Sequence, residues 1–192
     1  MVTLNKIYTR TGDGGSTRLA SGEPAAKNAP RVEAYGSVDE TNACVGLVRL
    51  HTAKMAVLDG MLCRIQNELF DLGADLATPD RGKELGWEPL RILESQVERL
   101  EREIDQLNAE LEPLESFVLP AGSAASTYLH LARTVCRRAE RTTVSLMADP
   151  EEKVSAAALK YLNRLSDFLF VAARWANGKG ADEVLWKPGA TR

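Results

Sequence analysis

The sequence is poor in the residues that build metal centres, nucleophilic triads and disulfide frameworks. Its 192 residues include only two histidines and three cysteines, and no two cysteines have the C-x-x-C spacing of a zinc or redox site. Neither His51 nor His130 follows a glutamate by three residues, so the Glu-x-x-His motif of di-iron bundles is absent. These absences disfavour a histidine-bound catalytic metal and leave no recognisable Ser–His–Asp set. We interpret His51 as a surface or helix-end residue, and His130 as a helix residue whose ring has hydrogen-bond partners.

The chain also lacks a surplus of positive charge and any long apolar run. It has 24 basic and 27 acidic residues, a net charge of −3, whereas proteins that wrap nucleic acid are usually basic. The longest purely apolar stretch, residues 168–173, is far too short to span a bilayer, and the first six residues contain no apolar signal core. Cys44, Cys63 and Cys136 lie in apolar, helical patterns, which predicts buried, reduced thiols. We therefore expect a cytoplasmic protein that binds neither nucleic acid nor a membrane.

What the sequence does contain is apolar residues at helical spacing. Intervals of three and four separate the leucines and isoleucines of two stretches, as in amphipathic helices. Ser37 and Glu40 form a capping-box pattern, while Asp149 as N-cap and Pro150 after it predict another helix start. Helices are therefore expected at residues 37–52, 54–77, 89–110, 123–148 and 149–177. With no strand-rich region or internal repeat, the predicted fold class is all-α, a five-helix bundle with an irregular glycine-rich N-terminal segment.

We expect a single domain over residues 1–192. Residues 1–35 are rich in Gly, Thr, Ser and Pro and have no sustained period, which predicts an irregular segment. Residues 36–180 are the expected helical bundle, because glycines at 178 and 180 stop the last helix. Residues 181–192 remain as a tail.

The first segment that carries chemistry is the glycine-rich run at residues 9–18. Three glycines within residues 12–15 permit positive φ angles and close approach of the backbone, and consecutive N–H groups in such turns bind anions. Positive charge comes from Arg10, Arg18 and Lys27. No G-K-[ST] follows, so this is not a Walker A loop. A flexible surface turn and an anion-binding loop are both compatible with these residues.

The second segment is a cluster of arginines in the fourth expected helix. Arg133, Arg137 and Arg141 are spaced by four and share one face, with Arg138 and Glu140 beside them. Like charges at this spacing repel each other, so carboxylates, solvent or a bound polyanion must offset the repulsion. Arginine grips a triphosphate in bidentate fashion. A solvated basic face and an anion site both fit the pattern.

The third segment places polar residues on the apolar fifth helix. Asn163 and Asp167 share a stripe with Phe170 and Arg174, and polar groups on such a helix need partners. Asp167 fits either a salt bridge to the arginines of the fourth helix or a direct ligand contact. The carbonyl oxygen of Asn163 suits Mg²⁺ or a phosphate-bound water.

Five short motifs occur in order over nearly the whole chain: KIYTRTGD at 6–13, YGSVDE at 35–40, FVLP at 117–120, CRRAER at 136–141 and LNRLSD at 162–167. Together they resemble the PduO-type ATP:cob(I)alamin adenosyltransferases. The resemblance implies transfer of the 5′-deoxyadenosyl group of ATP to the cobalt of a reduced cobalamin or other corrinoid, with Mg²⁺ as cofactor. Triphosphate is released and adenosylcobalamin is formed. It also implies a homotrimer with active sites between subunits.

The resemblance assigns a role to each candidate site residue. It implies that residues 1–35 are the ATP-binding segment, and that ATP is held there by Thr9, Arg10, Thr11, Gly12, Asp13, Gly15, Thr17, Arg18 and Lys27. The neighbouring subunit would complete the nucleotide site with Arg137, Arg138, Glu140, Arg141 and Asn163, of which Asn163 would also help to hold Mg²⁺. Gly14 departs from the family, because many members carry lysine there.

Four further assignments concern the corrinoid and the interface. The resemblance implies that Asp39 pairs with Arg133 across the interface, where Asp167 is also expected. Phe117 would press on the lower face of the corrin ring and displace its nucleotide-tail base. Arg137, Asn163 and Phe117 are thus the expected catalytic residues.

The implied reaction explains why the sequence needs few histidines. Cobalt(I) is itself a strong nucleophile, so the protein positions ATP and stabilises the charge that grows on triphosphate. A reductase must supply the reduced cobalt, and a B12-dependent enzyme must accept the product. Two other functions remain compatible with the sequence: an oligomeric scaffold that senses nucleotide without catalysis, and a weakly RNA-binding bundle that uses the arginines of the fourth helix.

Overall fold

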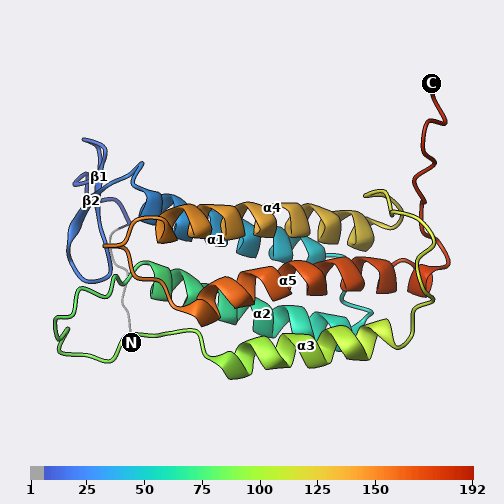
Figure 1. Cartoon of the computed structure of the whole chain (residues 1–192), viewed down its shortest axis with the longest axis horizontal. Coiled ribbons are helices and arrows are strands. Elements are labelled where there is room, and N and C mark those ends of the chain that lie inside the picture. Colours follow the sequence, from blue (N-terminus) through green and yellow to red (C-terminus); the bar gives the residue numbers. More distant parts are fainter. Residues whose placement is uncertain (1–6) are drawn as a thin grey trace.

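Five long helices lie side by side along the long axis of the molecule (Figure 1). The computed structural model describes residues 7–192. The helices are α1 (Pro30–Arg49), α2 (Ala56–Leu76), α3 (Glu94–Asn108), α4 (Ala124–Met147) and α5 (Ala156–Trp175), followed by a 3-10 turn, η1 (Gly178–Gly180). The predicted all-α, five-helix fold class is confirmed. Over the described residues, no helix is long and apolar enough to cross a membrane.

The core lies around α5, which packs against both α4 and α3, while α1 packs against α4 and α2. Leu162, Leu165, Phe168 and Leu169 of α5 are fully or almost fully buried. Burying each such side chain stabilises the fold by about 1.5–3 kcal/mol. This apolar packing fixes the relative positions of the helices that carry the candidate site residues.

A small antiparallel hairpin precedes the bundle, although no strands were expected. Strands β1 (Ser16–Arg18) and β2 (Pro24–Ala26) pair with Thr17 opposite Ala25. Each has three residues, too few for an alternating pattern to be recognised in the sequence. Leu19 is buried, and the backbone N–H of Ala20 donates to the carbonyl of Ala77 over 3.0 Å. These contacts dock the hairpin on the end of α2.

The first helix begins earlier than the capping-box pattern predicted. It starts at Pro30, after Ala29 in an extended conformation. Ser37 lies inside the helix, about two turns after its start, and is buried. Proline suits a first helical position because its ring fixes φ and its missing N–H would have no helical partner. The irregular N-terminal segment therefore ends at residue 29, and the predicted start at Ser37 was wrong.

Two other helices begin later than predicted. Ser155, not Asp149, caps α5, and its side chain accepts a hydrogen bond from the N–H of Ala158 over 3.1 Å. Asp149 instead accepts from the N–H of Glu151 over 3.0 Å and forms a separate turn. Helix α3 begins at Glu94 rather than at 89, because the residues before it are extended. For α5, a residue suited to helix capping was taken from the wrong turn; for α3, the apolar spacing located the helix but not its first residue.

The cysteines occupy three different environments. Cys136 is fully buried, and its thiol donates to the carbonyl of Leu162 over 3.3 Å. Cys44 is half-buried and Cys63 is exposed; all three are free. The predicted burial is confirmed for Cys136 and wrong for Cys63, which lies on the solvent side of α2.

The end of the bundle opposite the hairpin is closed by the loop before α4 and the C-terminal tail. The N–H of Leu119 donates to the carbonyl of Val184, and the N–H of Trp186 donates to the carbonyl of Phe117, both over 2.8 Å. Asn177, almost fully buried, accepts from the N–H of Ser123 over 2.9 Å. These bonds hold the loop and the tail together.

Gly122→Ala is expected to destabilise this closure. Gly122 has φ of 101°, and a Cβ there would overlap the side-chain amide of Asn177. Strained backbone and a displaced buried amide together cost about 2–3 kcal/mol, which lowers Tm by roughly 4–12 °C in a domain of this size. Thermal unfolding measures the change. Gly60→Ala is the matched control: its Cβ meets nothing within 4 Å, so an equal loss of Tm there would contradict the steric explanation.

Candidate functional site

A pocket of about 540 Å³ opens between the glycine-rich turn and the hairpin. It is lined by Thr9, Thr11, Gly12, Ser16, Thr17, Arg18, Pro24 and Lys27. Apart from Ser16 and Pro24, every lining residue was a predicted ATP-binding residue. Arg10, Asp13 and Gly15 belong to the same turn but do not line the pocket. Ser16 and Pro24 were missed because the strands that carry them were not recognised.

The turn brings a lysine close to the backbone at a position where a larger residue would be tightly packed. A Cβ on Gly12 would lie 3.1 Å from Nζ of Lys27 and 3.2 Å from the carbonyl oxygen of Ser16. Gly15, with φ of 84°, accepts from the N–H of Lys27 over 2.9 Å. Arg10 also has a positive φ, and its guanidinium lies 5.7 Å from the centre of the Tyr8 ring. This backbone is therefore shaped for close approach of a ligand.

The pocket has the charge of an anion site. Its lining contains two cations, Arg18 and Lys27, and no acidic residue. Arg18 donates to the carbonyl of Gly22 over 2.9 Å, and Lys27 makes no ion pair with any residue in 7–192. Uncompensated cations beside a glycine-rich turn attract phosphate groups.

The arginines of α4 present a second cationic surface. Arg137, Arg138 and Arg141 are all exposed. Arg138 forms an ion pair with Glu40 of α1, and Arg141 donates to the carbonyl of Arg137 over 3.0 Å. The guanidinium of Arg137 has neither a hydrogen bond nor an ion pair in the described part of the chain. Carboxylates therefore offset only part of the cluster's charge.

Asn163 and Glu140 meet between α5 and α4. The amide Nδ2 of Asn163 donates to Oε1 of Glu140 over 2.8 Å. This bond leaves the side-chain oxygen Oδ1 of Asn163 and the second carboxylate oxygen of Glu140 available. Residues 7–192 contain no group of three or more His, Cys, Asp or Glu side chains that could hold a metal ion by themselves. Mg²⁺ commonly takes one or two protein oxygens together with phosphates and waters, so these two residues fit it.

Asp167 does not reach the arginines of α4. It accepts from Nη1 of Arg164, one turn earlier on α5, over 2.9 Å, and both side chains are at least a third exposed. Of the two alternatives that the sequence left open for Asp167, the salt bridge to the arginines of the fourth helix is not formed. A partner three residues away on the same helix is close without any interhelical contact.

Three nitrogen atoms on two side chains of α4 are buried without hydrogen-bond partners among residues 7–192. They are the Nε of Arg133 and both ring nitrogens of His130. Burial, and next the charge of Arg137, lower the pKa of Arg133. Burial also lowers the pKa of His130, whose ring contacts that of Phe170 edge-on at 6.1 Å. The prediction that His130 has hydrogen-bond partners was wrong, because its ring packs on an aromatic ring. His51 is exposed as expected and stacks on Tyr128.

Phe117 is exposed, at 76% of its full area, rather than packed on the core. Its nearest aromatic neighbour is Trp186 of the tail, with ring centres 6.0 Å apart. Asp39 is also exposed, and it lines a mainly apolar pocket of about 440 Å³ between α1 and α2. The sequence contained a signal for that pocket, since Phe70 is followed by small residues at 73, 74 and 77. In the structure these residues line the pocket and Phe70 is 72% exposed.

The arginines of α4 do not line the hairpin pocket of their own chain. None of the residues that line the hairpin pocket belongs to α4 or α5. Figure 1 shows the hairpin beyond the end of the helices, where α1 begins and α4 ends. The contacts between the hairpin and α4 involve the end of the helix: Ser145 and Leu146 line a small pocket with Leu19, Glu23 and Ala25, whereas Arg137 lies further back on α4.

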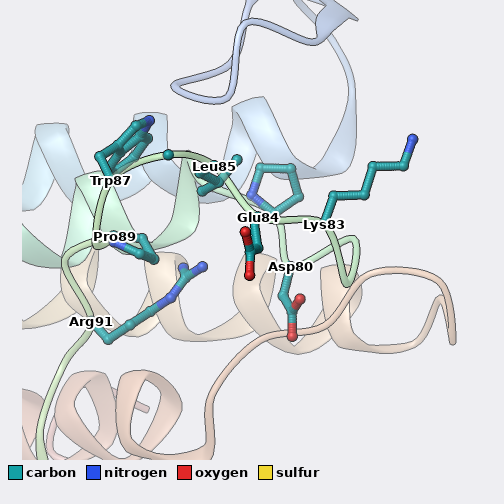
Figure 2. Close-up of a pocket in the computed structure, with 9 residues that line it drawn as sticks. Asp80, Lys83, Glu84, Leu85, Trp87, Pro89 and Arg91 are labelled. Atoms are coloured by element: carbon teal, nitrogen blue, oxygen red, sulfur yellow. The ribbon is translucent and has the colours of Figure 1, made fainter.

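A further hollow lies in the long loop between α2 and α3 (Figure 2). Trp87, Pro89 and Arg91 border it on one side, and Asp80, Lys83 and Glu84 on the other. Sequence reasoning assigned no role to this loop, and none of the predicted site residues lines it.

Comparison with known proteins decides the family. Residues 7–176 match the family described as cobalamin adenosyltransferase. The chain belongs to this family. The corrinoid adenosyltransferase of Mycobacterium tuberculosis is 47% identical over 193 residues, which cover 100% of this chain and 97% of that protein. The one from Bacillus subtilis is 42% identical over 189 residues, covering 96% and 94%.

A solved structure agrees in fold with this adenosyltransferase. It is that of a variant PduO-type ATP:corrinoid adenosyltransferase from Lactobacillus reuteri, complexed with cobalamin and ATP. The two are 39% identical and superpose with a TM-score of 0.85, over 95% of this chain and 97% of the other. The activity of this chain is thus corrinoid adenosyltransfer, and the predicted family and reaction are confirmed.

Proposed function

We propose that this adenosyltransferase binds ATP between two copies of the chain and transfers its 5′-deoxyadenosyl group to the cobalt of a reduced corrinoid. One observation carries the proposal. The hairpin pocket and the exposed Arg137 are both suited to phosphate, yet Arg137 does not line that pocket in its own chain. A neighbouring copy would bring its α4 arginines to the hairpin pocket and complete one site.

The reaction asks the protein for positioning and charge. Cobalt(I) attacks the 5′ carbon of ATP, a Co–C bond forms, and the C–O bond breaks with its electron pair passing to triphosphate. No proton transfer is needed at the reacting atoms. The turn at residues 9–15, with Arg18 and Lys27, holds the phosphates, and Arg137 and Arg141 stabilise the charge that grows on the leaving group.

Mg²⁺ belongs with the phosphates in this arrangement. Asn163 and Glu140, which are joined by the hydrogen bond from Nδ2 to Oε1, would hold it through the side-chain oxygens that this bond leaves available. Bound there, the ion would neutralise part of the phosphate charge. Arg138, held by Glu40, would border the same site from α4.

The active form is proposed to be a homotrimer. Arg133 has a partly buried guanidinium whose Nε lacks a partner among the described residues, and Asp39 is exposed. Pairing them across an interface would satisfy both groups. Large apolar side chains that are exposed on α1, α2 and α4 and just after α1 support an interface: Leu47, Leu50, Val57, Phe70, Leu131 and Val144. Asp167 is placed there as a further polar residue.

Phe117 is proposed to contact the lower face of the corrin ring. Its exposed ring, held beside Trp186 by the backbone bonds of the tail, presents an apolar surface to a ligand. Such a surface would exclude water and the nucleotide-tail base from cobalt. Exclusion of these ligands favours reduction of cobalt(II) to cobalt(I), because the lower state binds axial ligands weakly.

Absorbance spectroscopy tests the proposed function. The purified protein is mixed anaerobically with chemically reduced cob(I)alamin, ATP and Mg²⁺. We expect the cob(I)alamin spectrum to convert to that of a light-sensitive alkylcobalamin, with one triphosphate released for each product formed. ADP in place of ATP is the control for the phosphate chain. Binding of ATP with an unchanged cobalt(I) spectrum would instead favour a nucleotide-sensing scaffold.

A further inference from the structure

Four charged side chains connect the hairpin to three other parts of the chain. Glu23 stands directly before β2, Arg81 lies in the loop after α2, Glu152 lies in the turn before α5, and Arg31 is in α1. Arg81 Nη2 lies 3.3 Å from Glu23 Oε1 and 2.9 Å from Glu152 Oε1. The Nε of Arg31 donates to Glu152 Oε2 over 2.8 Å. The four form one continuous network of alternating charge.

The inner end of this network is fixed in the bundle. Arg31 is only 3% exposed, and its Nη1 donates to the carbonyl of Leu76 over 2.6 Å. Burial disfavours the charged carboxylate of Glu152, yet hydrogen bonds from Arg81 and Arg31 outweigh it and lower its pKa. Glu152 therefore stays ionised at neutral pH and gives Arg81 a fixed partner.

The loop that carries Arg81 is itself held at both ends. Arg91 Nη1 donates to Asp75 Oδ1 over 2.6 Å and to the carbonyl of Thr78 over 2.8 Å. The N–H of Ile92 donates to the other carboxylate oxygen of Asp75 over 2.9 Å. Figure 2 shows Arg91 and Asp80 on the two sides of this loop. Arg81 also donates from Nη1 to the carbonyl of Glu151 over 2.9 Å, so its guanidinium has a defined orientation.

The hairpin has few other attachments. Leu19 is buried, and Ala20 makes one backbone bond to Ala77. Within the described residues, the pair of Glu23 with Arg81 is the only ion pair between segment 7–29 and the rest of the chain. The placement of Thr17, Arg18 and Lys27 relative to the bundle thus depends on a small number of contacts.

We propose that Arg81 is a positioning residue for ATP: by gripping Glu23 and Glu152 together, it holds the hairpin in the orientation that receives the triphosphate. The proposal rests on the proposed role of the hairpin pocket in ATP binding. Arg81 and Glu23 are 32% and 41% exposed, respectively. Exposed ion pairs add only about 0–1 kcal/mol to global stability, so Arg81 affects where the hairpin sits more than whether the chain folds.

Arg81→Ala is the test. We expect the KM for ATP to rise about tenfold, because a displaced phosphate-binding turn must be reordered by the ligand. The kcat at saturating ATP and the KM for the corrinoid should change less than about twofold, and Tm by less than about 4 °C. The Kd for ATP, measured by calorimetry without corrinoid, should rise in parallel with its KM. An unchanged Kd and KM for ATP would overturn the proposal.

Two further variants separate positioning from a general structural role. Glu23→Gln should also raise the KM for ATP. The double variant should have the same KM as Arg81→Ala, because each single substitution already removes the contact between Glu23 and Arg81. Fully additive effects would overturn the link through Glu23. Arg81→Lys should recover part of the affinity, since one ammonium reaches one carboxylate but not both.

The matched control is Lys160→Ala, which removes another exposed ion pair, with Glu94, over 2.8 Å. It should leave the KM and Kd for ATP unchanged. If Arg81→Ala and Lys160→Ala raise the KM and Kd for ATP and lower Tm to the same extent, Arg81 has a general structural role and the proposal fails. The calorimetric Kd for ATP is measured without turnover, so it tests Arg81 independently of catalysis. A wild-type protein that bound ATP but formed no alkylcobalamin would contradict the proposed function and leave the role of Arg81 in ATP binding untouched.

Discussion

Arg137→Ala is expected to lower kcat by about 10²–10³, which corresponds to the loss of one preorganised donor to developing charge. Within residues 7–192 the Arg137 guanidinium has no hydrogen bond or ion pair, so folding does not depend on its charge. We therefore expect Tm to stay within about 2 °C of wild type. Initial rates of alkylcobalamin formation, with thermal unfolding in parallel, measure both effects.

Two controls separate the position of Arg137 from the general loss of an arginine and from the loss of its charge. Arg102→Ala removes another exposed helical arginine, on α3, and should leave both kcat and Tm unchanged. Arg137→Lys keeps a point charge but loses the planar fork that grips phosphate at two points. It should recover only part of the lost rate. Equal losses of stability and activity in Arg137→Ala would identify a structural arginine instead.

Mixing two inactive variants is expected to restore activity. Lys27→Glu damages the hairpin pocket by reversing a charge, and Arg137→Ala damages the α4 surface. If each site takes its hairpin from one copy and its arginines from a neighbour, a mixed trimer contains some sites in which neither half is damaged. Random assembly from equal amounts makes about one site in four intact, because each half has even odds of being undamaged.

Every mixed trimer holds two copies of one variant and one of the other, so one of its three sites is intact. The expected recovery in purified mixed trimers is therefore about a third of wild-type activity per site, from two variants that are each nearly inactive. Co-expression with two different affinity tags, followed by purification through both, isolates the mixed assemblies. A double variant with Lys27→Glu and Arg137→Ala in one chain, mixed with itself, is the negative control. A mixture as inactive as its parts would place both halves of the site in one chain and contradict the proposed arrangement.

The extent of the helices followed largely from local pattern. The apolar period of the second expected helix predicted ends within about two residues of those of α2, and the range expected for the fourth helix agrees equally well with α4. The first residues of α1 and α5 were less predictable, because each helix has two candidate start sites. Ser37 and Asp149 both have the chemistry of an N-cap, but Pro30 begins α1 earlier and Ser155 caps α5 later.

Candidate residues close together in the chain were also within reach of sequence reasoning. The turn at residues 9–15 and Lys27 come together in one pocket because a short hairpin brings them back. Asn163 and Glu140 lie on adjacent helices, and their contact depends on how α4 packs against α5. Their types suggested a phosphate or Mg²⁺ role, but their distance could come only from the structure.

By itself, the sequence determined the five helices, the family and the chemical character of the two cationic segments, because these follow from local periodicity and ordered motifs. Only the tertiary structure decided that the α4 arginines do not line the hairpin pocket of their own chain, that Asp167 pairs with Arg164, and that Arg81 joins Glu23 to Glu152. The last contact spans 58 residues on one side and 71 on the other. Such pairs form where packed helices place their loops at one end of the bundle, and no local pattern encodes that meeting.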